Sequence, residues 1–174
     1  MHIPLFDKYN KNKKIIFHLK IKNHIMMNWS TITYRQLLAL RNAADIKDET
    51  EKLCAIAQIV FGGDVLNLPL KEFNEKCKEL SFLTTEPANN LRVKSVKVNG
   101  REYYFDGLLG NITTAQYIDF QNWQKANDDV KSFSVFIIPK GHKYNDGYDM
   151  EQVFNDILDM PTPVLLSASF FFNR

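Results

Sequence analysis

A short sequence motif, called the repeated phrase below, occurs twice in this chain, and it constrains the fold more than any other feature. Residues 32–40 read ITYRQLLAL and residues 112–120 read ITTAQYIDF. In both copies a threonine stands three positions before a glutamine, which is the spacing of a helix capping box. The threonine oxygen accepts from an amide of the first turn, and the glutamine reaches back to the cap amide. The phrase therefore predicts two helix starts, with the cap pairs Thr33–Gln36 and Thr113–Gln116.

Further helices follow from apolar residues at intervals of three and four, the period of one helix face. The segment 47–63 has an acidic first turn and a double glycine at its end, and the segment 68–80 has a proline at its start. Asp149 with Gln152 forms a third cap pair, before a helix that ends near Met160. The stripes are Leu53, Ile56, Ala57 and Val60; Leu70, Phe73, Cys77 and Leu80; and Met150, Val153, Phe154 and Ile157.

A hairpin is predicted at 92–106. Asn99 followed by Gly100 is a strong two-residue turn signal, and β-branched and aromatic residues flank it. Alternation places Tyr103 and Phe105 on one face and the intervening tyrosine on the other. Packing of the hairpin on helices is the favoured interpretation. Stacking of bases on its aromatic residues, beside Lys94, Lys97 and Arg101, is the alternative.

The segment 128–141, DDVKSFSVFIIPKG, allows two interpretations. Val130, Phe133, Phe136 and Ile137 fit helical spacing and favour a helix. The segment is also short enough that a strand stays open.

The fold class predicted from these elements is mainly α with a small β-hairpin (α+β). Residues 1–27 differ from the rest, because a polar, basic stretch precedes the alternating IIFHLKI, and they predict an N-terminal arm or edge strand. Residues 28–174 form the helical domain. The repeated phrase leaves two alternatives. It marks two pseudo-repeated halves, 80 positions apart (112 − 32), that form a groove for a partner, or it is a coincidence of a common capping pattern.

Known catalytic and nucleotide-binding motifs are absent from the sequence. The histidines are scattered, and Cys54 and Cys77 form no C-x-x-C pair. We therefore expect no metal, no cofactor and no enzyme activity. Both cysteines fall on helical stripes and are interpreted as core residues, with a disulfide as the less favoured alternative. The stretch 143–152 lacks the rhythm of a calcium loop, so Asn145-Asp146-Gly147 is predicted to be a turn.

Membrane insertion and nucleic-acid binding receive little support. The first residues lack the apolar run of a signal peptide, and no stretch approaches the ~20 apolar residues that span a bilayer. We therefore expect no membrane partner and a reducing cytoplasm. The net charge of +2 is too small to indicate nucleic acid by itself. The basic cluster that could contact phosphate is Lys8, Lys11, Lys13 and Lys14.

Five aromatic residues are predicted to contact partners. Trp29 and Trp123 stand at the edges of the repeated segments and are interpreted as core or interface residues. Phe170, Phe171 and Phe172 follow an apolar helical segment. They predict a partner surface near the end of the chain, or a natural chain that continues past Arg174.

The order of the segments resembles a known group of proteins. WSTITYRQLLAL, a helix pair ending in LSFL and a hairpin precede LLGNITTAQYIDFQNW, VFIIPKGHKYNDGYD and an apolar helix. From about Trp29 to Phe172, this is similar to small proteins encoded among the virion and tail genes of tailed bacteriophages. The closest are tail-assembly-chaperone-like proteins, including those of crAss-like and other Bacteroidetes phages. The matching positions are the two cap pairs, the loop Pro139–Tyr144 and the aromatic tail. The N-terminal segment departs from the pattern, and it suits a protein that docks into a larger assembly.

The resemblance implies a non-enzymatic structural or assembly protein that acts by protein–protein binding. It would be a virion tail or cargo component, or a tail-assembly chaperone, in the virion or in the host cytoplasm during assembly. The implied partners are other phage structural proteins, in homo- or hetero-oligomers. The alternative is a nucleic-acid-binding accessory protein of the particle, which would use the basic cluster and the hairpin.

Overall fold

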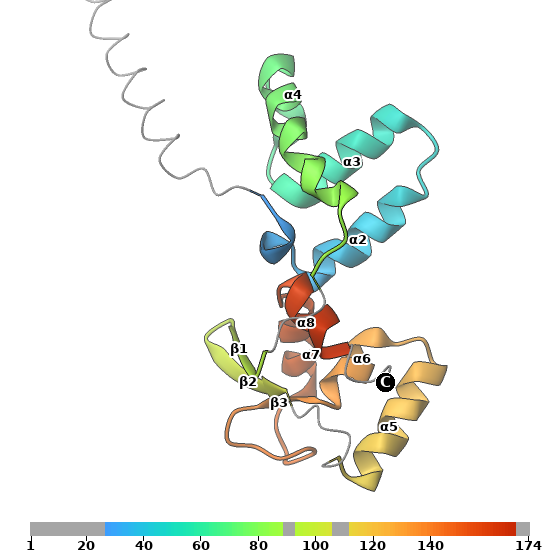
Figure 1. The fold of residues 1–174 in the computed structure, drawn as a ribbon, viewed down its shortest axis with the longest axis vertical. Helices are drawn as coiled ribbons and strands as arrows, with labels where there is room; N and C mark the ends of the chain where they lie inside the picture. Colours follow the sequence, from blue (N-terminus) through green and yellow to red (C-terminus); the bar gives the residue numbers. More distant parts are fainter. Residues whose placement is uncertain (1–26, 89–92, 106–111, 170–174) are drawn as a thin grey trace, which may run out of the picture.

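The computed structural model describes residues 27–88, 93–105 and 112–169, and it is mainly helical with a small antiparallel sheet (Figure 1). The predicted α+β class is confirmed. The α-helices are α2 (Tyr34–Ala44), α3 (Glu49–Phe61), α4 (Leu70–Lys78), α5 (Thr114–Lys125), α6 (Asp129–Ser134), α7 (Met150–Leu158) and α8 (Thr162–Ser169). The strands are β1 (Ser95–Val98), β2 (Arg101–Phe105) and β3 (Ile137–Pro139), and the 3-10 turns are η1 (Trp29–Thr31), η2 (Val65–Asn67) and η3 (Glu79–Thr84).

Six of these helices form two sets of three that start at a constant offset in the sequence. Helices α2, α3 and α4 begin at residues 34, 49 and 70, and α5, α6 and α7 begin 80 positions later (114 − 34), at residues 114, 129 and 150. Helices α4 and α7 also have the same length, 9 residues. Helices α3 and α6 differ in length, with 13 and 6 residues, so the correspondence lies in the helix starts. We therefore call residues 32–84 the first half and residues 112–169 the second half.

The predicted capping boxes are present at both repeated phrases. The backbone amides of Thr33 and Thr113 donate to the side-chain oxygens of Gln36 and Gln116 at 3.0 and 2.9 Å. Each threonine hydroxyl oxygen accepts in return from the backbone amide of the glutamine. Each glutamine also donates from Nε2 to a carbonyl of its own half, of Ile59 at 2.9 Å and of Val135 at 3.0 Å. In each half, the glutamine side chain thus caps the start of a helix and also hydrogen-bonds that helix to a later segment of the same half.

The starts of α3, α6 and α7 also use side-chain caps, whereas the start of α4 at Pro69 has none. Asp48 and Asp128, again 80 positions apart, accept from the backbone amides at the starts of α3 and α6, at 2.7 and 3.0 Å. Asp149 caps α7 as predicted. Gln152 differs from the prediction, because its amide donates to Asp156 at 3.3 Å and no return to the cap is formed.

The sheet has three antiparallel strands in the order β1-β2-β3. Asn99 and Gly100 both have positive φ, at 49° and 81°, as the predicted two-residue turn requires. The expected helix over 128–141 is only partly right, since α6 ends at Ser134. Ile137 and Ile138 then pair with β2 as β3. Extended pairing with an existing strand therefore outweighs the helical spacing at this position.

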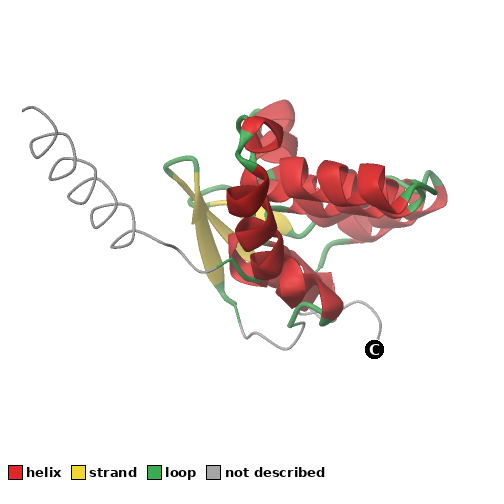
Figure 2. Ribbon diagram, turned by 90° about the horizontal axis from the view of Figure 1, so that it is seen from above, coloured by secondary structure: helices red, strands yellow, loops and turns green. Residues whose placement is uncertain are grey.

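Two hydrophobic cores lie on either side of α2, and backbone hydrogen bonds at the start of this helix join the halves. The amide of Tyr34 donates to the carbonyl of Met160 at 2.9 Å, and the amide of Thr162 donates to that of Ile32 at 2.8 Å. Figure 2 shows the sheet to one side of the helices. The core within the first half contains Ile32, Ala57, Val60, Val65 and Leu80, and the core shared by the halves contains Tyr34, Leu37, Val98, Tyr103, Ile137, Val153, Ile157, Met160 and Leu165.

Candidate functional site

A buried carboxylate, Asp156 of α7, holds the hairpin. It is 0% exposed and accepts from Arg101 Nε at 2.6 Å, from Arg101 Nη2 at 3.0 Å and from Asn99 Nδ2 at 2.8 Å. The hydroxyl of Tyr103 donates a short hydrogen bond to the same carboxylate, and Gln152 completes the set. We call these five residues the Asp156 cluster. It fastens β2 and the β1–β2 turn to α7.

The electrostatics of the Asp156 cluster favour an anchoring role. Burial alone raises the pKa of Asp156, but hydrogen bonds from Arg101, Tyr103 and Asn99 outweigh it and lower that pKa to about 2. Burial, with the hydrogen bond to Asp156, raises the pKa of Tyr103 to about 12. A general acid or base works best with a pKa near the operating pH. The carboxylate and the phenol are instead held in fixed protonation states near neutrality.

Sequence reasoning missed this cluster. Asp156 lies beside Ile157 and three residues after Val153, within the apolar stripe of α7. A carboxylate on a buried helix face needs donors. An aspartate within the apolar stripe was therefore the available sequence signal, although it does not identify the donors.

A hollow of about 560 Å³ opens between the sheet, the start of α5 and the loop after β3. The hydroxyl of Tyr144 donates to the Asp119 carboxylate of α5 at 2.6 Å, and burial together with this bond raises the pKa of Tyr144. Residues 106–111, between β2 and α5 in the sequence, lie outside the described residues. We therefore assign no ligand to it. Its lining includes Tyr104, Gln116, Ile138, His142, Lys143 and Tyr144.

The loop Pro139–Tyr144, one of the positions that carry the phage resemblance, is fastened at both ends. Near its start, the Lys140 amide donates to the Glu102 carbonyl at 2.8 Å, and Lys140 Nζ pairs with the Glu102 carboxylate at 2.8 Å. At its end, Tyr144 binds α5. The predicted turn after it is confirmed, with positive φ at Asn145 and Gly147.

The two tryptophans predicted to contact partners are half-buried in contacts within the chain. Trp29 Nε1 donates to the Thr85 carbonyl at 2.8 Å, and its ring meets Phe82 edge-on at 5.5 Å. Trp123 carries the Lys131 ammonium 4.6 Å above its ring. Both therefore have structural roles, and a partner would meet only their exposed parts. The other predicted contacts, Phe170, Phe171 and Phe172, lie outside the described residues, as does the basic cluster of Lys8, Lys11, Lys13 and Lys14.

The hairpin packs on the helices, as favoured from the sequence. Tyr103 is 0% exposed and Phe105 packs against the shared core, while Tyr104 points outward. A platform for bases would need several open rings, and on β2 only Tyr104 is open among the described residues.

Apolar side chains are exposed on the outer faces of two helical regions. Leu66 of η2 and Leu70 of α4 are 52% and 74% exposed, although Leu70 belongs to the stripe predicted to be buried. Tyr117 and Ile118 of α5 are each 52% exposed. These two pairs are the most exposed large apolar side chains of the described surface, ahead of Tyr104 at 40% and Leu53 at 39%, and other proteins could contact them.

The structure offers no sign of metal or membrane chemistry within residues 27–88, 93–105 and 112–169. No group of three or more His, Cys, Asp or Glu side chains there could hold a metal ion. None of the helices in this part of the chain has the length and apolar character that crossing a bilayer requires. Cys54 and Cys77 are free thiols, each half-buried, and Cys77 packs against the core of the first half.

The candidate site is therefore a set of exposed apolar surfaces on a scaffold whose parts are held together by hydrogen bonds. The Asp156 cluster fixes the hairpin, the joint at Tyr34 and Thr162 fixes the halves, and the exposed leucines, Tyr117 and Ile118 remain open. No family model, curated protein or solved structure matches this chain.

Proposed function

We propose that this chain acts by binding other proteins, as a structural or assembly component of a tailed-bacteriophage particle. The observation that supports it is the exposure of Leu66, Leu70, Tyr117 and Ile118 on helices of both halves. Large apolar side chains at more than half exposure cost free energy in water, and covering them with a partner recovers it. Helix faces of this kind are typical surfaces for protein contacts.

The assignment to a phage particle rests on the resemblance in the order of segments. The fastened loop Pro139–Tyr144 and the two capping boxes are the described parts that carry it. The third part, the aromatic tail of Phe170, Phe171 and Phe172, lies outside the described residues.

The test is the composition of the particle. Virions of the phage that encodes the chain are purified, and the polypeptide is quantified by mass spectrometry. A stoichiometric amount supports a tail or cargo component. Absence from virions, with recovery in complexes with particle proteins from infected cells, supports an assembly chaperone. Recovery in neither would overturn the proposal.

A variant links the test to the surface. Leu70→Asp places a charge on the most exposed leucine of the described chain, and we expect it to lower recovery with particle proteins at least tenfold. Leu53→Asp is the matched control, because Leu53 is 39% exposed on the neighbouring helix α3. Equal recovery of both variants would show that the α4 surface is not a contact. Phe170→Asp with Phe172→Asp tests the tail in the same way.

A further inference from the structure

The two cysteines of the chain lie on neighbouring helices of the first half. Cys54 is in α3 and Cys77 is in α4, and both are half-buried free thiols. Helix α4 passes beside α3 and contacts it (Figure 1). The sequence contains only these two cysteines, so a disulfide within the chain must join α3 to α4.

Cys54 shares a helix face with residues that meet α4 and the core of the first half. Residues three and seven positions apart lie on one face of a helix. On the face of Cys54 these are Ala57, which is 0% exposed, and Phe61, and both belong to that core. The ring of Phe61 also contacts α4, because Lys76 Nζ lies 4.7 Å above it. This face of α3 is therefore turned toward α4.

Cys77 lies on the face of α4 that is turned toward the same core. It packs against the core of the first half beside Phe73, one turn earlier. Burial raises the pKa of the Cys77 thiol, and the charge of Cys54 raises it further. The energy between two charges falls with their separation. The helix faces and this electrostatic effect thus agree that the two thiols are near each other.

We propose that Cys54 and Cys77 form a redox-sensitive modification site, which closes to a disulfide between α3 and α4 under oxidation and opens again on reduction. With glutathione disulfide as the oxidant, the thiolate of one cysteine attacks a glutathione sulfur and releases one reduced glutathione. The thiolate of the other cysteine then attacks the mixed disulfide, forms the new S–S bond and releases the second glutathione. Each cysteine gives up one proton and one electron, and the two glutathione thiols take them up.

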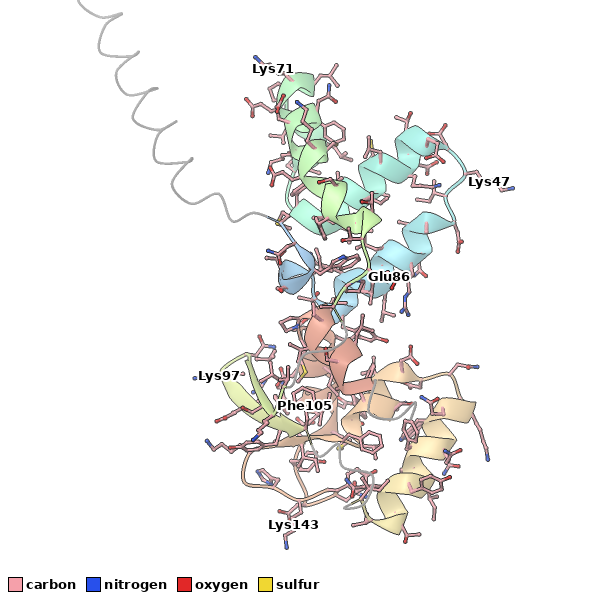
Figure 3. The ribbon with its side chains drawn as sticks, in the orientation of Figure 1. Lys47, Lys71, Glu86, Lys97, Phe105 and Lys143 are labelled. Atoms are coloured by element: carbon pink, nitrogen blue, oxygen red, sulfur yellow. The ribbon has the colours of Figure 1, made fainter. Side chains whose placement is uncertain are left out.

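The disulfide would stabilise a helix that has few attachments of its own. The start of α4 at Pro69 has no side-chain cap, and none of the residues of α4 is fully buried. In Figure 3, Lys71 in the first turn of α4 lies at one end of the molecule. Segments with few buried contacts open at a low cost in free energy. A covalent link from Cys77 to α3 therefore limits the opening of the helix that carries Leu70.

The first measurement is the covalent state of the oxidised chain. The full chain is treated with glutathione disulfide, the remaining thiols are blocked by alkylation, and monomers are separated by non-reducing electrophoresis and digested with trypsin. Trypsin cleaves after lysine, so Cys54 is in the peptide 53–71 and Cys77 is in the peptide 77–78. We expect mass spectrometry to find these two peptides joined, and dithiothreitol to separate them.

The second measurement is urea denaturation of the oxidised and the reduced chain. Cys54 and Cys77 are 23 positions apart (77 − 54), and a disulfide that closes this loop restricts the unfolded chain. We expect oxidation to raise the urea midpoint of the wild type by about 1 M. Cys54→Ser and Cys77→Ser cannot form the link, so the same oxidation should leave their midpoints unchanged. Cys77→Ala replaces Cys77→Ser if that variant unfolds.

The other outcomes contradict the inference. Thiols that stay free, cross-links that occur only in dimers, or glutathione bound to both cysteines at once would each overturn the intramolecular disulfide. An equal rise of the midpoint in a single-cysteine variant would show that oxidation stabilises the chain without linking α3 to α4. The inference needs no partner protein, so neither result bears on the proposed function, which the composition of the particle tests separately.

Discussion

Helices α2 and α5 begin with the same capping box and then meet different surroundings. Tyr34 of α2 is 1% exposed, because the shared core and a hydrogen bond to Asp129 hold it. Its counterpart in α5 is the exposed Thr114. Leu37 and Tyr117 differ in exposure in the same way. The repeated phrase thus determines the interior of each half, and contacts between halves determine the outer face.

The third helices of the two halves carry opposite charges at one equivalent position. Position 76 of α4 is a half-exposed lysine whose Nζ lies 4.7 Å above the ring of Phe61. Position 156 of α7 is the buried aspartate that holds the hairpin. The same place on equivalent helices therefore carries a surface contact in one half and a buried anchor in the other.

The largest expected effect separates Asp156 from Lys76. Asp156→Ala leaves Arg101, Asn99 and the Tyr103 hydroxyl without their acceptor, so we expect the free energy of unfolding to fall by about 3 kcal/mol. Lys76→Ala removes one partly exposed cation–π contact and should cost less than about 1 kcal/mol. Urea denaturation measures both. Similar losses in the two variants would show that the hairpin anchor contributes no more than a surface contact.

The next effect tests the difference between the leading helices. Leu37→Ala opens a cavity in the shared core, and we expect a loss of about 2 to 3 kcal/mol. Tyr117→Ala removes a side chain that is half in water, and the monomer should change by no more than about 0.5 kcal/mol. Both are measured by urea denaturation at low protein concentration. A large loss for Tyr117→Ala would mean that α5 is covered within the chain itself.

The pH dependence of stability should belong to the second half. The pKa of Asp156 falls from 3.8 to about 2 on folding, so its contribution is complete above pH 4 and is lost as the pH falls through 2. The shift corresponds to a contribution on the order of 2 kcal/mol. Asp156→Asn should flatten the decline of stability between pH 4 and pH 2 in urea titrations.

The control for this titration is a carboxylate of the first half. Glu75 of α4 is exposed and pairs with Lys78 at 2.8 Å. Glu75→Gln should leave the acid decline almost unchanged, because an exposed pair is screened by solvent. If Glu75→Gln flattens the decline as much as Asp156→Asn does, the acid sensitivity is a property of the whole surface.

The sequence predicted the features that depend on neighbouring residues. The caps at Thr33, Thr113 and Asp149 and the turn at Asn99 and Gly100 each need only a few consecutive residues, so their chemistry is visible in the sequence. The helical stripes were partly correct: most of their members lie in or against the cores, but Leu53 and Leu70 are 39% and 74% exposed. These local signals were sufficient for the fold class and for the order of the elements.

Features that depend on distant residues were missed or mistaken. Leu70 continues an apolar stripe, but it is 74% exposed because no other element of the described residues covers that end of α4. Ile137 fits a helix by spacing and joins a strand, because β2 offers it backbone partners. The partners of Asp156 lie more than 50 positions away in the sequence. Burial and pairing of this kind follow from tertiary packing, which the spacing of residues along the chain does not report.

The smallest effect concerns the glutamines that the halves share. Gln116 is 2% exposed, and its acceptor is the carbonyl of Val135, a residue that is 1% exposed. Gln116→Ala should therefore cost about 2 kcal/mol, since it removes the return to the cap amide and leaves a buried carbonyl without a donor. Gln36 is only half-buried, so water can replace it, and Gln36→Ala should cost about 1 kcal/mol.

Thermal and urea denaturation of the two variants, beside Gln124→Ala as an exposed control on α5, would measure this difference. We expect the control to stay within about 0.5 kcal/mol of wild type. A larger loss for Gln36 than for Gln116 would mean that the first half depends more on its glutamine than the second. The second half would then be held by the Asp156 cluster and the sheet, and the capping box would contribute to it only as a start signal for α5.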